Sequence, residues 1–91
     1  MKTKTHPMTG EPSNEQRAEW AQHAMDAFGR KVFGGRSFDA LDGDQEDAIS
    51  DLICDLLHLC IVRGIDPDNV TRRAIGHFAE EIAQEMEGRP N

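Results

Sequence analysis

Three aspartates and a histidine recur in the middle of the chain at the spacing of one face of a helix. Asp47, Asp51 and Asp55 are four residues apart, and His58 follows three residues later. At 3.6 residues per turn these positions fall within roughly 80° of arc, with successive carboxylates about 6 Å apart along the axis. The pattern predicts a row of negative charge that faces solvent, a divalent metal ion or a basic partner.

A metal ion is one ligand that this row could hold. Carboxylates at i and i+4 with a histidine at i+7 suit a hard divalent cation, and Asp51, Asp55 and His58 have this spacing. A later helix could complete the site with His77, Glu80 and Glu81. A largely apolar helix also needs a polar stripe where it meets water, and acids supply one. We favour this simpler interpretation, a solvated or partner-facing stripe without a bound metal.

No catalytic signature accompanies the row. The chain has no Ser/His/Asp order and no Gly-rich phosphate loop, and neither Cys54 nor Cys60 lies at a helix N-terminus or beside a base. The two cysteines lie about 9 Å apart along one predicted helix and point about 120° apart, so they cannot bridge each other and are expected to be buried thiols. We predict a protein that is not an enzyme and needs no cofactor.

Acidic residues are concentrated in the middle third of the chain. The net charge is −7, and residues 39–68 contain nine acids but one base, Arg63. Such a field repels phosphate backbones and attracts basic protein surfaces, which predicts a basic protein partner and no direct binding to nucleic acid. The predicted binding residues are Asp44, Asp47, Asp51, Asp55 and His58.

Length and composition are typical of one small soluble domain. The chain has 91 residues, of which 37% are hydrophobic and 30% charged, and a chain of this size buries only about two-thirds of its unfolded surface. The longest uncharged run, residues 56–62, is too short to span a membrane, and no apolar signal segment follows the start. We expect a cytoplasmic protein without membrane contacts.

The N-terminal third is predicted to contain an arm, a helix and a long connection. Residues 1–12 lack a hydrophobic pattern and are expected to form a flexible arm before a single helical domain over residues 13–91. Ser13 and Gln16 form a capping-box signature before a first helix over residues 14–30. In the connection that follows, apolar side chains are expected to turn back onto the core: Val32, Phe33, Phe38 and Leu41.

Two further helices follow, each with its own start signal. Asp44 is the expected N-cap of a second helix that ends at Arg63, with Gly64 as the residue after it. Asp66 and Pro67 repeat the N-cap signal for a third helix, which ends before Gly88 and Pro90.

The second helix is apolar around most of its circumference, with Leu56 in the middle of the apolar arc. We therefore predict an all-α fold, a three-helix bundle around this central hydrophobic helix, with Trp20 of the first helix in the core. An arc this wide also indicates a further partner surface, and the simplest partner is a second copy of the chain in a homodimer.

Part of the chain resembles the all-α nucleoside triphosphate pyrophosphatases, the MazG-like group. The resemblance lies in residues 51–59, DLICDLLHL, followed by the turn Gly64-Ile65-Asp66 and a third helix. It implies a magnesium-dependent enzyme with Asp51 and Asp55 as ligands, and this is the alternative function. The family's ExxD pair is incomplete, because Ala48 replaces its glutamate, and its EExxE motif is absent from the first helix.

Most of the chain also resembles small acidic helical proteins of phages and other mobile elements. The resemblance rests on residues 17–21, RAEWA, residues 46–58, EDAISDLICDLLH, and residues 73–78, RAIGHF. It implies a host-takeover or anti-defence factor that binds and blocks a host protein, including nucleic-acid-binding complexes such as CRISPR effectors. The main functional hypothesis is thus a non-enzymatic, anti-CRISPR-like inhibitor, and the other alternative is a structural homodimer or assembly subunit.

Overall fold

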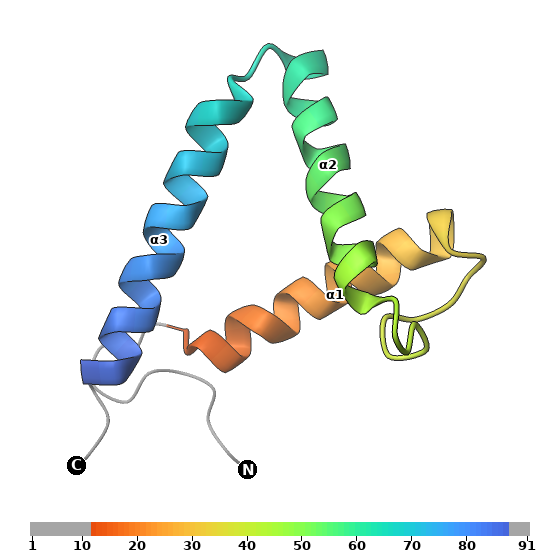
Figure 1. The fold of residues 1–91 in the computed structure, drawn as a ribbon, viewed down its shortest axis with the longest axis horizontal. Helices are drawn as coiled ribbons and strands as arrows, with labels where there is room; N and C mark the ends of the chain where they lie inside the picture. The colour runs from red at the N-terminus through yellow and green to blue at the C-terminus, as the bar shows by residue number, and fades with distance from the viewer. Residues whose placement is uncertain (1–11, 88–91) are drawn as a thin grey trace.

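Three α-helices enclose an open triangle, and the later part of α1 extends beyond α2 (Figure 1). The computed structural model describes residues 12–87, which contain α1 (Asn14–Val32), α2 (Gln45–Arg63) and α3 (Pro67–Glu87). α2 and α3 diverge from a tight turn, α1 crosses between their far ends, and each helix contacts the other two. The all-α fold with three mutually packed helices is confirmed.

The start of α1 has the predicted capping interaction. Ser13 has an extended backbone, and its Oγ accepts a hydrogen bond of 3.1 Å from the backbone N–H of Gln16. The helix continues two residues past its expected end, to Val32. Its last turn contains Arg30 and Lys31, whose positive charges favour the carboxyl end of a helix.

The turn between α2 and α3 is determined by backbone chemistry at Gly64. Its φ of +71° is a left-handed conformation that favours glycine. The N–H of Ile65 donates to the carbonyl of Cys60 at 2.8 Å, and that of Gly64 donates to Ile61 at 3.2 Å, which together form a Schellman motif. Asp66 then accepts from the N–H of Asp68 at 3.0 Å, so the predicted boundaries of this turn are confirmed.

The hydrophobic core is small and joins α1, the connection and α2. Met25, Leu41 and Ala48 are its buried members, and Phe28, Phe33, Phe38 and Leu52 pack partly buried against them. Phe28 and Phe33 meet edge to face, with ring centroids 5.6 Å apart. The connection therefore turns back onto the core as expected, except at Val32, which is exposed.

Several side chains expected in the core are exposed instead. Trp20 is 54% exposed because the side of α1 that packs on α2 is that of Met25, roughly 140° away around the helix. Leu56 is 49% exposed and Cys54 is also exposed, whereas Cys60 is buried as predicted. These expectations were wrong because α1 and α3 touch α2 near its two ends and leave its middle open.

The central position of α2 is not confirmed, since neighbouring helices do not enclose it. The radius of gyration is 15.6 Å, against about 12 Å for a compact chain of this length. The predicted arm lies, apart from Pro12, outside the described residues, as do Gly88 and Pro90. None of the described helices combines the length and the apolarity needed to cross a bilayer.

Two helical glycines provide a matched test of this packing. A Cβ at Gly29 would collide with the carbonyl oxygen of Arg36, whereas a Cβ at Gly76 would meet open space. We expect Gly29→Ala to lower the free energy of unfolding by about 1–3 kcal/mol, as overpacking does. Gly76→Ala should raise it by about 0.5–1 kcal/mol, because alanine favours a helix interior.

Urea unfolding followed by circular dichroism at one protein concentration measures both values. Equal and favourable effects of the two substitutions would show that α1 does not approach the connection closely at Gly29.

Candidate functional site

The predicted binding residues lie together on one exposed side of α2. We call this set the acidic stripe: Asp44, Asp47, Asp51, Asp55 and His58. All five are exposed. A helical rise of 1.5 Å per residue places Asp44 and His58 about 21 Å apart along the axis. The stripe is thus a narrow line of four carboxylates that ends at an imidazole.

No basic side chain of the described residues forms an ion pair with the acidic stripe. No ion pair or side-chain hydrogen bond joins any of its five residues to another described residue. Asp44 stands at the N-cap of α2, yet its carboxylate makes no capping hydrogen bond. Because the carboxylates lie on the same side and stay hydrated, their fields add outside the protein. The arrangement attracts a positively charged surface.

The packing of α2 explains why the stripe faces outward. Ala48 and Leu52 belong to the cluster that contacts α1. At 100° per residue the stripe lies about 80° to one side of this line of contact, and Ile49, Ile53 and Leu56 lie about 85° to the other side. α2 therefore has a charged flank and an apolar flank, separated by the line along which it packs.

The residues that would complete a metal site do not converge on the stripe. His77 and Glu80 are exposed on α3, and Glu81 is turned toward α1. Within residues 12–87 no group of three or more His, Cys, Asp or Glu side chains is placed to hold a metal ion. The structure brings together only the carboxylates and imidazole of α2 itself.

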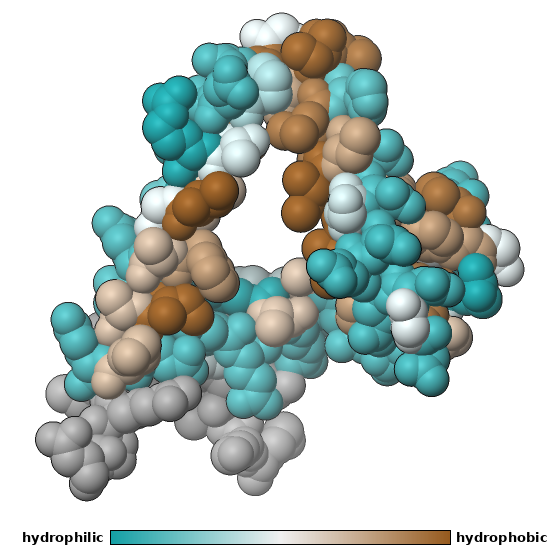
Figure 2. Space-filling view, in the orientation of Figure 1, coloured by the Kyte–Doolittle hydropathy of each residue, from teal (hydrophilic) through white to brown (hydrophobic). Residues whose placement is uncertain are grey.

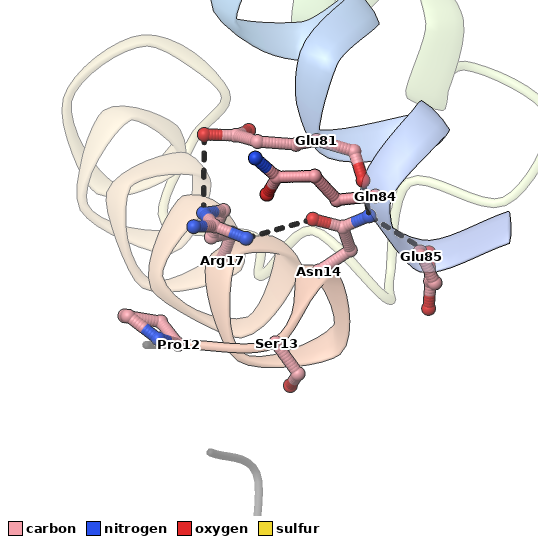
Figure 3. Close-up of a pocket in the computed structure, with 7 residues that line it drawn as sticks. All are labelled: Pro12, Ser13, Asn14, Arg17, Glu81, Gln84 and Glu85. Carbon is pink, nitrogen blue, oxygen red and sulfur yellow. Dashed lines mark hydrogen bonds and ion pairs between the residues drawn. The ribbon is translucent and has the colours of Figure 1, made fainter. Parts of the chain in front are cut away.

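Glu81 belongs to a polar junction between the start of α1 and the end of α3 (Figure 3). Its carboxylate forms an ion pair with the guanidinium of Arg17, with an N–O distance of 3.3 Å. Asn14 donates through Nδ2 to the carbonyl of Glu81 at 3.1 Å and to the carboxylate of Glu85 at 2.7 Å. Its Oδ1 accepts from Arg17 at 2.8 Å. The junction closes the triangle, so these residues are structural.

Sequence reasoning did not foresee that an acidic residue of α3 lies near the end of the stripe. His58 borders a shallow hollow whose wall across the turn includes Asp68 and Thr71. Asp68 is exposed and lies in the first turn of α3. The Asp66-Pro67-Asp68 sequence marks a helix start, but only the turn at Gly64 brings that start close to His58.

No protein-family model, curated protein or solved structure matches this chain. The stripe's own geometry and charge are therefore the basis for a functional proposal.

An exposed and unpaired stripe predicts that its charges are dispensable for folding. Replacement of Asp47, Asp51 and Asp55 by Asn removes two repulsive i,i+4 pairs, each worth about 0.2–0.5 kcal/mol. Loss of Asp47 from the first turn of α2 offsets part of this gain. We expect the same helix content by circular dichroism and a thermal midpoint that is unchanged or slightly higher. An unfolded triple variant would show instead that the carboxylates are needed inside the fold.

Proposed function

We propose that this protein is a non-enzymatic acidic interaction module that binds a basic surface of a larger protein and blocks the contacts of that surface with nucleic acid. One observation carries the proposal. The five residues of the acidic stripe are exposed, aligned and without partners in the described part of the chain. Repulsion between the aligned carboxylates costs free energy in the free protein. A cationic surface bound over the stripe would offset that repulsion.

The stripe resembles a phosphate backbone in charge and linear form. Four carboxylates from Asp44 to Asp55 span about 17 Å, at intervals of about 4.5–6 Å. Lysine and arginine side chains that contact phosphates in a binding groove would pair equally with carboxylates. The long-range attraction would speed association and weaken as salt is added. The module would therefore compete with nucleic acid for the same groove.

We further propose that the target is a host nucleic-acid-binding defence complex, with the protein acting as an anti-CRISPR-like inhibitor in the cytoplasm. The support is the resemblance of residues 17–21, 46–58 and 73–78 to small acidic proteins of phages and mobile elements. Interference by occupation of a basic groove would need only the exposed charge that α2 presents.

A capture experiment with two charge-matched variants tests this function. The stripe variant carries Asp47→Asn, Asp51→Asn and Asp55→Asn. The control variant carries Glu46→Gln, Glu80→Gln and Glu87→Gln, which removes the same charge from exposed positions outside the stripe. The wild type and the control should both capture the same basic protein from host lysate, as identified by mass spectrometry. The stripe variant should lose it.

The captured protein then supplies the decisive measurement. Wild-type protein should displace nucleic acid from the purified target, with an affinity that falls as ionic strength rises. Equal loss of binding in the two variants would mean that total charge, and not the stripe, is recognised. A target whose nucleic-acid binding is unaffected would contradict the blocking mechanism.

The non-enzymatic part of the proposal has its own test against the pyrophosphatase alternative. Ala48 stands where that family carries a glutamate, and here its side chain is buried in the core cluster. Asp51 and Asp55 alone are too few carboxylates to hold the magnesium ions of a nucleoside triphosphate substrate. We expect no pyrophosphate release from any nucleoside triphosphate with magnesium. Release above a protein-free control, abolished by Asp51→Ala, would establish the enzyme instead.

A further inference from the structure

Hydrophobic side chains remain uncovered on both edges of the opening between α2 and α3. Figure 2 shows hydrophobic residues along these edges. Two groups define what we call the apolar face: Ile49, Ile53 and Leu56 on α2, and Ile75, Phe78 and Ile82 on α3. Each of these six residues is between 38% and 63% exposed. Each group lies within roughly 60° of arc on its helix, at intervals of three or four residues.

The uncovered area is large for so small a chain. Twelve large hydrophobic side chains within residues 49–86 are exposed. The six of the apolar face, at roughly 80 Å² each, present about 500 Å² of surface, as much as the largest apolar patch of a typical monomer. By contrast, the buried hydrophobic residues of the described chain are Met25, Leu41, Ala48 and Cys60. More large hydrophobic side chains are thus exposed than buried in the described part of the chain.

We propose that a second copy of this chain covers the apolar face, so that the protein is a homodimer held together by α2 and α3. If each copy buried its apolar face, these side chains alone would contribute about 1,000 Å² to the interface, which is the area that a specific interface must reach. In a two-fold symmetric interface the same patch of both copies makes the contact, and an uncharged patch can do so without charge repulsion. This inference goes beyond the proposed function and does not depend on it.

The distribution of charge favours a second copy as the occupant of this face. The apolar face and the acidic stripe lie roughly 165° apart around α2. Two chains, each with a net charge of −7, can therefore join without placing their stripes against each other. A basic partner would be drawn to the stripe, on the side of α2 opposite the apolar face. The dimer would keep both stripes in solvent.

The helix geometry also suits packing between identical chains. Side chains at intervals of three and four residues form the ridges that interlock when two helices pack. Both α2 and α3 have such a row. The space-filling view shows that the opening between the two helices is not filled by their side chains (Figure 2). A small domain with a small core commonly gains its stability from such an assembly.

Light scattering after gel filtration, together with sedimentation equilibrium, tests the proposal on the full chain. The wild type should have twice the single-chain mass of 10.2 kDa. Phe78→Glu and Leu56→Glu place a charge in the apolar face and should raise the dissociation constant at least about 30-fold, as loss of a central contact does. His77→Glu adds the same charge at the exposed neighbouring position, and this control should remain a dimer.

The thermal midpoint of the wild type tests dimerisation without any variant, so the test does not depend on whether a variant folds. It should rise with protein concentration, because unfolding then includes dissociation. A wild-type mass of one chain with a midpoint independent of concentration overturns the proposal, even if the apolar face then proves to bind a different protein. A Phe78→Glu chain that stays dimeric also overturns it. The stripe variant with three Asn substitutions should remain a dimer, so loss of target binding and loss of dimerisation are distinguishable.

Discussion

The packing of α1 against the connection and the first half of α2 is the interaction on which the rest of this structure depends. Leu41 is only 2% exposed and lies between Met25 and Ala48, so one loop residue joins two helices. Gly29 lets the connection approach α1 where any other residue would meet the Arg36 carbonyl. Asp26 reinforces the contact by accepting a hydrogen bond of 2.8 Å from the N–H of Phe38. This small cluster sets the rotation of α2 about its axis.

That rotation separates the two surfaces of α2. With Ala48 and Leu52 turned toward the cluster, the acidic stripe falls on one flank of the helix and the apolar face on the other. Charged and apolar surfaces on one helix can therefore serve different partners without competition. In the functions proposed above, contacts of the stripe would weaken as salt is added, whereas those of the apolar face would depend on burial.

The triangle is held at its corners by three different kinds of interaction. Hydrophobic packing joins α1 to α2, a Schellman turn at Gly64 joins α2 to α3, and the polar junction of Asn14 and Arg17 with Glu81 closes α3 onto α1. The third corner is partly exposed, and ion pairs of that kind contribute little stability. Since the middles of α2 and α3 are uncovered, a second copy in the opening would stabilise the angle between these two helices. Folding and assembly would then be coupled.

The helices and their ends were predictable from the sequence, because they depend on neighbouring residues. Ser13, Gly64 and Asp66 act through hydrogen bonds and backbone conformations within a few positions of themselves, and the structure has each where the sequence predicts it. The exposure of the acidic stripe was also foreseeable, since no carboxylate is buried without a partner. The exposure of Trp20 and Leu56 was not predictable in this way, and neither was the hollow between Asp68 and His58. A helical pattern identifies the apolar side chains of a helix. Which of them become buried depends on the angles at which helices distant in the sequence pack. Contacts between residues far apart in the chain set those angles.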